Sequence, residues 1–374
     1  MLAAETRCAG GMRAAIPGAH FIIALAAIVL QPARSPAVGA PVPVVEMAEL
    51  SPLPGDCDDN GEVSVDELVG GVRIVLGIER PESCPGLDRN SDDVVTVDEL
   101  VAAIAADLRG PSRAFANPEP VTIRGYEGVA MEPFVSRDGR YLFFNNSNAP
   151  SVNTNLYWAE RIDDVTFEYE GEIAGVNSEA LDAVPSMDSD GNFYFVSTRS
   201  YTKTLSTIYS GSFSAGAVAG VEIVQGISKK IPGDVNFDAE ISADGNTLYF
   251  VDGEFVVGSI IPVAADLAIA VRGNGLFERL DESPELLANV NSDALEYAPS
   301  VSANGLELFF TRLAGSFPAI CRAARRGSNA PFGVPEQIPA IEGFVEAPSL
   351  SPDGRSLYYH RLQGGSFAIY RVSR

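Results

Sequence analysis

Apolar residues in the last two-thirds of the chain follow a pattern that returns about every fifty residues. Each return has an Asp-Gly or Asn-Gly turn, which begins at Asp138, Asp190, Asp244, Asn304 or Asp353. Five positions after each of these residues stands an aromatic residue with apolar neighbours: Phe143, Phe195, Tyr249, Phe309 and Tyr358. Because these short runs are apolar on both faces, they are typical of strands buried between two neighbouring sheets.

The same repeat predicts the strands around each aromatic run. A first strand precedes the turn, a polar fourth strand ends the repeat, and the third strand includes Leu156, Ile208, Leu267, Ile320 or Ile369. Five sets of four strands predict a mainly β protein with a five-bladed β-propeller over residues 117–374. A sixth, degenerate blade within the long third repeat is the alternative. The last repeat stops at its third strand, so residues 117–125 are expected to supply the missing strand and close the ring.

Residues 54–109 carry two acidic stretches with the spacing of calcium-binding EF-hand loops. The oxygen donors expected in the first loop are Asp56, Asp58, Asn60, the Glu62 carbonyl, Ser64 and Glu67. Those expected in the second loop are Asp88, Asn90, Asp92, the Val94 carbonyl, Thr96 and Glu99. Alternate side chains of such a loop converge on one cation, and the last glutamate closes the site from the exit helix. The tandem pair predicts two Ca²⁺ sites, against the alternative of two acidic turns that bind nothing.

The two loops differ at the turn position, where the first has Gly61 and the second has Asp93. Aspartate adopts left-handed backbone geometry at a cost of about 1 kcal/mol, so the second site is expected to be weaker. The exit helices are expected to bury two apolar stripes: Leu68, Val69, Val72, Val75 and Leu76 in the first, and Leu100, Val101, Ile104 and Leu108 in the second. Cys57 and Cys84 flank the first unit, which favours a disulfide over two free thiols.

Two parts of the chain resemble known families. The paired loop-and-helix units of residues 54–109, which lack an entering helix, resemble a dockerin module. That resemblance implies a cohesin-like protein partner and calcium ions that hold the two helices together. The phrase APSLSPDGRSLYYHRL, residues 347–362, resembles the β-propeller repeat of TolB-like proteins, and this resemblance covers residues 117–374. It implies the fold and says little about activity, because propellers host unrelated functions.

The first forty residues have the pattern of an export signal. Arg7 and Arg13 precede the apolar run 21–30, and the small residues Val38 and Ala40 follow it. The apolar run is shorter than the roughly twenty residues that a membrane span needs, so residues 1–40 are expected to be cleaved. Residues 41–53 and 110–116 are expected to be linkers. The mature protein is therefore expected to be secreted, periplasmic or at the cell surface, without stable membrane insertion.

Charge and composition exclude several functions. The formal net charge is −24, from 26 Lys+Arg against 50 Asp+Glu. A nucleic-acid partner is therefore not expected, because binding to its phosphates needs clustered positive charges. The chain has only two histidines, His20 and His360, so serine-hydrolase triads and His-ligated zinc sites lack their parts. We expect His360 to be a packed or rim histidine and not a ligand.

Acidic residues occur near the first strand of each repeat: Glu132, Asp182, Asp238, Glu296 and Glu346. Such carboxylates suit a glycoside hydrolase or lyase, but acidic residues are so frequent that solvated or strand-capping roles are preferred. No catalytic residue is assigned on this ground. The sequence therefore favours an exported calcium-binding protein whose propeller is a non-catalytic platform for a protein or a glycan. A carboxylate-dependent hydrolase or lyase, attached through the dockerin-like module, is the alternative.

Overall fold

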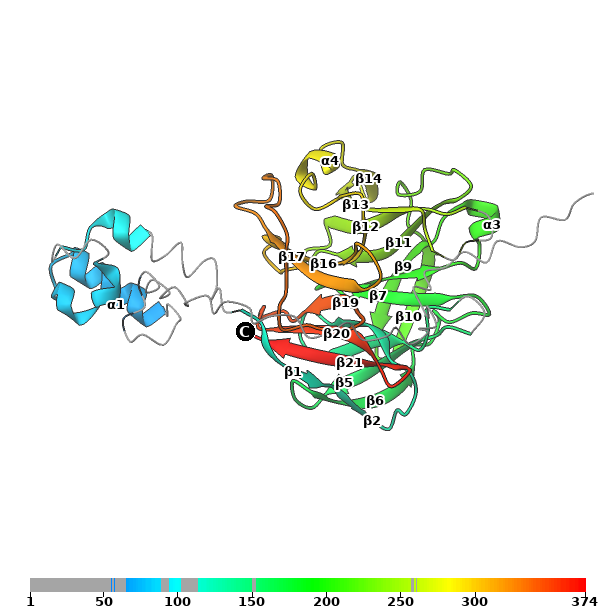
Figure 1. The fold of residues 1–374 in the computed structure, drawn as a ribbon, viewed down its shortest axis with the longest axis horizontal. Helices are drawn as coiled ribbons and strands as arrows, with labels where there is room; N and C mark the ends of the chain where they lie inside the picture. Colours follow the sequence, from blue (N-terminus) through cyan, green and yellow to red (C-terminus); the bar gives the residue numbers. More distant parts are fainter. Residues whose placement is uncertain are drawn as a thin grey trace, which may run out of the picture. The chain divides into compact units, whose positions relative to one another are not determined.

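The structure is a computed structural model, and the residues that it describes are 55, 57, 65–88, 94–101, 114–149, 153–256, 259 and 261–374. They belong to two compact units (Figure 1). The small unit ends at Ala116, and the large unit runs from Asn117 to Ser373. The predicted signal peptide, residues 1–40, and the first predicted linker, residues 41–53, lie outside the described residues.

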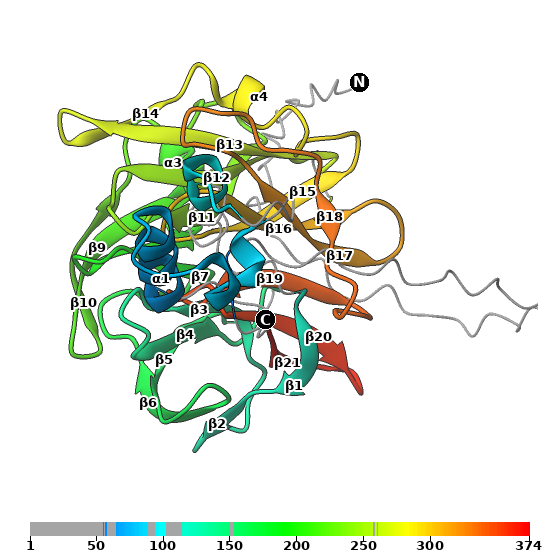
Figure 2. The ribbon, with the colours of Figure 1, turned by 90° about the vertical axis from the view of Figure 1, so that its left-hand side faces the viewer.

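The small unit is built from short helices (Figure 2), and these enclose an apolar core. Helix α1 spans Val65–Val75, the 3₁₀ turns η1 and η2 span Pro81–Ser83 and Pro85–Leu87, and a further helix begins at residue 97 and is described to residue 101. The core contains Ile74, Cys84, Leu87, Val95 and Leu100. A Cβ at Gly71 of α1 would lie 2.8 Å from both Leu87 and Leu100, so α1 packs closely because this residue has no side chain.

The predicted disulfide is confirmed. Cys57 and Cys84 are joined, with their Cα atoms 4.5 Å apart and a sequence separation of 27. A link of this length reduces the entropy of the unfolded chain. It therefore supplies stability to a unit whose apolar core is small.

The predicted apolar stripe of α1 is only partly right. Leu68 and Val75 pack against the core, but Val69, Val72 and Leu76 are 52%, 42% and 67% exposed. The helix has two apolar faces, and the buried one is the face that Gly71 allows to approach its neighbours most closely. Although α1 exposes apolar side chains, it is not long enough to cross a membrane, and neither is any other helix among the described residues.

The large unit consists of sets of strands, and within each set the strands pair antiparallel in chain order, as the repeat predicted. The first set is β3 (Met131–Val135), β4 (Tyr141–Asn145), β5 (Leu156–Arg161) and β6 (Thr166–Glu172). The second is β7 (Asp182–Met187), β8 (Asn192–Ser197), β9 (Ile208–Ser214) and β10 (Ala217–Ile223), with helix α3 (Tyr201–Thr204) between β8 and β9.

The third set is β11 (Asp234–Ile241), β12 (Thr247–Glu254), β13 (Ala264–Gly273) and β14 (Leu276–Arg279), and helix α4 (Ser283–Leu286) follows it. The fourth is β15 (Leu295–Val301), β16 (Glu307–Leu313), β17 (Pro318–Ala324) and the short β18 (Glu336–Gln337). A single parallel pair, Ala265 with Leu295, joins the third and fourth sets into one sheet. The last set is β19 (Val345–Leu350), β20 (Ser356–Gln363) and β21 (Ser366–Ser373).

The segment before the first set completes the last one, as predicted. Strand β1 (Ala116–Pro120) pairs with β21 and becomes the fourth strand of the sheet β1-β21-β20-β19. Strand β2 (Thr122–Arg124) then pairs in parallel with β6 of the first set. Arg371 of β21 adds ion pairs to Glu119 of β1 and to Asp164 in the first set. One short segment thus fastens the last sheet to the first.

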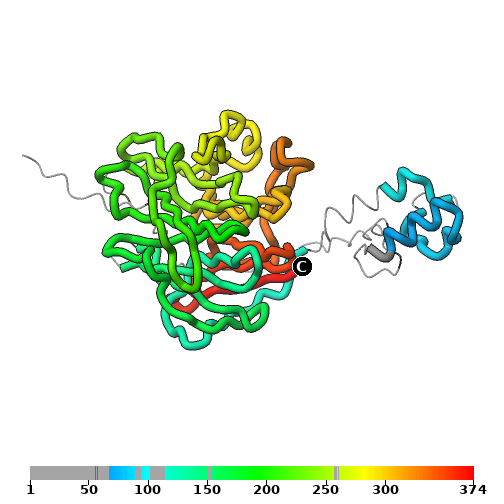
Figure 3. The backbone as a smooth tube through the Cα atoms, turned by 180° about the vertical axis from the view of Figure 1, so that it is seen from behind, coloured from blue at the N-terminus to red at the C-terminus, as the bar shows by residue number. Residues whose placement is uncertain are grey.

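The first strands of the five sets form a closed ring around an axis. β3 contacts β7, and contacts continue through β11, β15 and β19 back to β3. In Figure 3 the last, red strands accordingly lie beside the first, cyan strands of this unit. A ring of sheets whose first strands surround a common axis is the arrangement of a β-propeller.

The aromatic second strands are buried between the sheets, as expected. Their central residues are at most 2% exposed: Phe143, Phe195, Tyr249, Phe309 and Tyr358. The turn before each of these strands contains a glycine with φ between 70° and 82°. Glycine adopts this backbone conformation without strain, which is why the turn can be so tight.

Candidate functional site at the axis of the sheets

Each first strand has a bulge that brings one residue into left-handed backbone geometry beside the axis. The five residues have φ of 48–56°: Glu132, Val184, Asp238, Ala298 and Ala347. The pairing register shifts at each of these positions. A residue other than glycine in this geometry is strained and needs support from its surroundings.

Side chains from the neighbouring set supply part of that support. The backbone N–H of Val184 donates to Asn145, that of Ala347 donates to Thr311, and that of Glu132 donates to His360. His360 lies on β20 of the last set and Glu132 on β3 of the first, so their hydrogen bond helps to close the ring. This agrees with the expectation that His360 is a packed residue, and its side chain is fully buried.

The five carboxylates predicted near the axis separate into two groups. Asp182 accepts hydrogen bonds from the Ser178 N–H and hydroxyl at 2.6 and 2.7 Å and pairs with Arg199 at 2.5 Å. Glu296 repeats this arrangement, with Ser292 and with Arg312 at 2.7 Å. Both carboxylates are fully buried and paired, which indicates a role in holding the loop before the strand.

The other three carboxylates, Glu132, Asp238 and Glu346, gather with His360 at one end of the axis. The His360 Nδ1 atom accepts the Glu132 N–H at 3.1 Å, so the ring proton lies on Nε2 and is donated to Glu346 at 3.2 Å. The Tyr297 hydroxyl donates to the same carboxylate at 2.5 Å. Burial, and then the charge of Glu346, raise the pKa of Tyr297 well above its ordinary value, so the phenol keeps this proton.

Asp238 lacks the support that Glu346 receives. The side chain is 2% exposed. Its Oδ2 accepts the Ala298 N–H at 2.9 Å, whereas its Oδ1 is buried and has no hydrogen-bond partner among the described residues. Burial, and then the charge of Glu132, raise the pKa of the Asp238 carboxyl well above its ordinary value. Burial likewise raises the pKa of Glu132, which accepts a hydrogen bond from Asn148 at 2.5 Å.

A buried ion pair lies further along the same strands. Arg137, from the turn after β3, reaches Glu240 of β11 at 2.8 Å, and the two side chains are 6% and 5% exposed. Arg137 also donates to the Ile241 carbonyl, and Glu240 accepts a hydrogen bond from the Ser186 hydroxyl at 2.8 Å. The pair therefore ties the first, second and third sets together across the axis.

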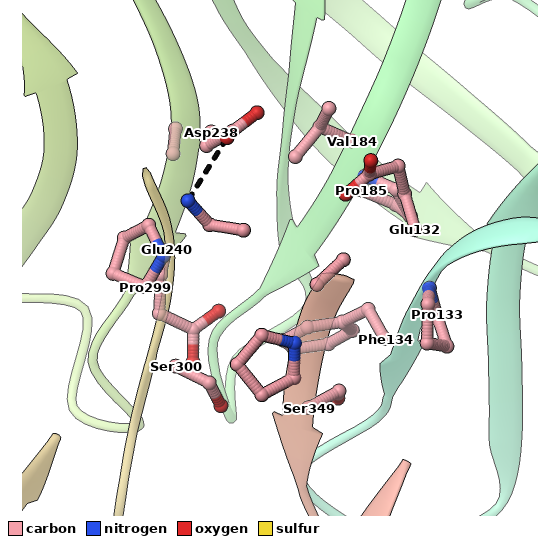
Figure 4. A pocket seen from close by; sticks show the side chains of 14 residues that line it. Glu132, Pro133, Phe134, Val184, Pro185, Asp238, Glu240, Pro299, Ser300 and Ser349 are labelled. Carbon is pink, nitrogen blue, oxygen red and sulfur yellow. Dashed lines mark hydrogen bonds between the residues drawn. The ribbon is translucent and has the colours of Figure 1, made fainter. Parts of the chain in front are cut away.

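A small cavity lies between the first strands (Figure 4). Its volume is about 30 Å³, and its lining includes Glu132, Asp238, Glu240, Ser300 and Ser349. This is room for about two water molecules. The cavity is therefore too small for a sugar ring.

The calcium ligands predicted in the small unit are only partly within the described residues. Asp56, Asp58, Asn60, Glu62, Ser64, Asn90 and Asp92 lie outside them. Asp88 is half-buried and Val94 is exposed. No group of three or more His, Cys, Asp or Glu side chains suited to a metal occurs within the described part of the chain.

The two glutamates that would close the loops are described, and both turn back from the start of a helix toward the loop before it. Glu67 Oε1 accepts the Cys57 N–H at 2.7 Å. Glu99 Oε2 accepts the Thr96 N–H and hydroxyl, each at 2.9 Å, while the Glu99 N–H donates to Thr96 Oγ1 at 3.3 Å. The second arrangement is a capping box. Glutamates in these positions fit the role of the last ligand in a calcium loop.

The sequence did not indicate the axial roles of Asn148, Tyr297 and Arg137. Tyr297 and Arg137 act across sets, 49 and 103 residues away, whereas Asn148 reaches Glu132 of its own set 16 residues away, so no local repeat marks them. A weak signal existed in the second strands, because Asn145, Thr311 and His360 occupy equivalent positions opposite the first strand. A polar residue at this otherwise apolar position indicates a buried hydrogen bond.

Known proteins resemble this chain in structure and not in sequence. No family model and no curated protein matches it. Similar solved structures include TolB from Acinetobacter baumannii, at 18% identity, 66% of this chain, 54% of that chain and a TM-score of 0.38. They also include Zg3597, a family 117 glycoside hydrolase from Zobellia galactanivorans, at 11% identity, 70% and 90% coverage and a TM-score of 0.47. A third is the catalytic domain of the Coprinopsis cinerea GH62 α-L-arabinofuranosidase, at 10% identity, 70% and 96% coverage and a TM-score of 0.43.

This chain thus spans about half the length of the Acinetobacter TolB. All three TM-scores lie below 0.5, so these similarities do not assign an activity. The chain's own strand pairing and closed ring define its class, which is the β-propeller.

Proposed function

We propose that this chain is an exported calcium-binding protein whose five-bladed propeller, residues 117–374, is a non-catalytic platform for a protein or glycan partner. The observation that carries the proposal is the packing of the axis. The carboxylates there are at most 7% exposed, and the cavity between them has about 30 Å³. A glycosidase needs two carboxyl groups on either side of a sugar, and here there is no room for one.

The small unit, residues 54–109, is proposed to bind two Ca²⁺ ions, the second more weakly. The expected donors are carboxylate, amide, hydroxyl and carbonyl oxygens, which calcium prefers. The ions would tie each loop to its exit helix. Glu67 and Glu99 already turn toward their loops, which supports this assignment. By its resemblance to dockerins, this unit is the candidate for contact with a cohesin-like protein.

Calcium titration of the full-length protein tests the first part. Glu67→Gln and Glu99→Gln should each remove or weaken one binding event, because an amide cannot supply two anionic oxygens. Neither change should alter the melting of the propeller, which the fluorescence of Trp158, the only tryptophan, reports. A wild-type protein that takes up no calcium in the small unit would reject the site assignment.

Activity against a polysaccharide panel tests the second part. One observation favours the hydrolase alternative, which is that burial raises the pKa of both Glu132 and Asp238, as a general acid requires. If the axis is catalytic, Glu132→Gln and Asp238→Asn should abolish turnover, whereas a change at the exposed Asp190 should not. Turnover that is lost in Glu132→Gln and Asp238→Asn contradicts the proposal of a non-catalytic platform. Binding of a glycan or protein without turnover supports that proposal.

A further inference from the structure

We propose that the axial cavity between Glu132 and Asp238 binds one divalent cation of the kind that prefers oxygen ligands, such as Ca²⁺. This site is separate from the two loops of the small unit. It does not depend on the function proposed above, because a bound ion at the axis would serve a platform and an enzyme equally.

The first ground is the missing counter-charge. Three carboxylates meet at this end of the axis, and among the described residues no arginine or lysine forms an ion pair with any of them. The only basic group in contact is His360, whose Nδ1 accepts a backbone proton and therefore holds no proton of its own. Buried carboxylates in proteins are paired, protonated or bound to a metal.

The second ground is the unpartnered oxygen of Asp238. Its Oδ1 atom is buried and accepts no hydrogen bond among the described residues, although Oδ2 accepts the Ala298 N–H. Other acidic groups of the axis differ in this respect. Glu346 is served by Tyr297 and His360, and Glu240 by Arg137 and Ser186. Asp238 thus has a buried oxygen that no described residue serves, unlike the carboxylates of Glu346 and Glu240.

The third ground is the space itself. Glu132 and Asp238 enter the same end of the cavity from opposite sides (Figure 4). The volume of about 30 Å³ holds one ion and one water molecule, and excludes a larger ligand. Among the described residues no group of three or more His, Cys, Asp or Glu side chains suited to a metal occurs, so Glu132 and Asp238 are the two acidic ligands proposed. Together they neutralise a divalent charge, and the other ligands would be oxygen atoms of the cavity lining and the one water molecule that fits beside the ion.

Thermal melting of the full-length protein, followed by Trp158 fluorescence, tests the site with CaCl₂ or MgCl₂ as the probe. Trp158 belongs to β5, so the signal reports the propeller and not the small unit. At about a hundredfold excess over the dissociation constant, the cation should raise the melting temperature by about 5 °C or more. Asp238→Asn should abolish this shift.

Two control variants sharpen the test. Asp234→Asn changes a half-buried aspartate of the same strand outside the cavity and should keep the shift. The double variant Glu67→Gln, Glu99→Gln removes the predicted ligands of the small unit and should also keep it. If the small unit binds no calcium, the melting shift of the propeller is therefore still expected. If the axial cavity binds no cation, calcium binding by the small unit is likewise unaffected.

Two outcomes would overturn the proposal. One is a wild-type protein whose melting does not respond to either salt, which would mean that the carboxylates share only a proton. The other is a shift that persists in Asp238→Asn. If that variant does not fold, Glu132→Gln replaces it, and native mass spectrometry counts the ions: the small-unit double variant should retain one, and its absence rejects the site.

Discussion

The buried pair of Arg137 and Glu240 is the most direct test of how the ring is held together. In Arg137→Met the apolar stem is preserved and the guanidinium is lost, so Glu240 remains buried at 5% exposure with only the Ser186 hydroxyl and a 3.4 Å contact to the Val301 N–H. Removing one partner of a buried ion pair costs about 3–5 kcal/mol, because the remaining charge is uncompensated. For a unit of this size, that corresponds to a fall in melting temperature of roughly 6–20 °C.

The double variant Arg137→Met, Glu240→Gln separates the charge from the packing. The glutamine still accepts the Ser186 proton, and no buried charge is left, so most of the lost stability should return. Urea unfolding followed by Trp158 fluorescence measures both proteins. Arg322→Met is a matched control: its pair with Glu307 is 33% and 14% exposed and should be worth less than about 1 kcal/mol. The reasoning is refuted if Arg137→Met costs no more than this control, or if the double variant is as unstable as the single one.

Three further predictions concern other parts of the chain. Cys57→Ser with Cys84→Ser should destabilise the small unit by about 3–4 kcal/mol through the entropy of its unfolded chain, measured by the helical circular dichroism signal, with Trp158 melting unchanged. Gly71→Ala should destabilise α1, because the new Cβ would lie 2.8 Å from two leucine side chains. The control Gly70→Ala places its Cβ where no atom lies within 4 Å, so it should stabilise the helix by up to about 1 kcal/mol. Equal effects of the two variants on calcium-dependent melting would be inconsistent with this packing. Finally, burial raises the pKa of the Asp238 carboxyl in the folded state. The stability that this carboxyl contributes to the wild-type protein is therefore complete below its unfolded pKa of about 4, and it is lost as the pH rises through its folded pKa. The amide of Asp238→Asn does not titrate. The stability of Asp238→Asn relative to wild type should therefore increase from pH 4 to 8 in urea midpoints, and a constant difference would show that the carboxyl is not perturbed.

Local chemistry made much of the large unit predictable. An Asp-Gly turn needs a left-handed glycine, and the run after it is apolar on both faces, so each turn fixes a hairpin and each run fixes a buried strand. The pairing of an early segment with the last repeat was also readable, because residues 117–125 resemble the fourth strand of the other repeats. A sheet edge that is left open favours the nearest compatible strand, and β1 fills it.

The axial cluster was predictable only as a set of candidates. Glu132, Asp182, Asp238, Glu296 and Glu346 all stand near a first strand, but the bulge in that strand decides which side chains turn to the axis. Asp182 and Glu296 lie two residues before the bulge and meet arginines, whereas Glu132 and Asp238 lie at it. An offset of one residue changes the face of a strand, a bulge introduces such an offset, and the sequence does not mark where a bulge falls.

The sequence by itself determined the repeat, the turns, the buried strands and the cysteine pair, because each depends on residues close together in the chain; the calcium loops stay a prediction from the same kind of local pattern. The tertiary structure alone decided which face of α1 is buried. It also decided that His360 of the last sheet accepts a hydrogen bond from the Glu132 backbone N–H of the first, and that Asp238 keeps an oxygen without a partner among the described residues. The two axial features arise where the first strands β3, β7, β11, β15 and β19 meet around one axis. The groups involved are separated by up to 228 residues, and their hydrogen bonds and charges interact only after the ring has closed.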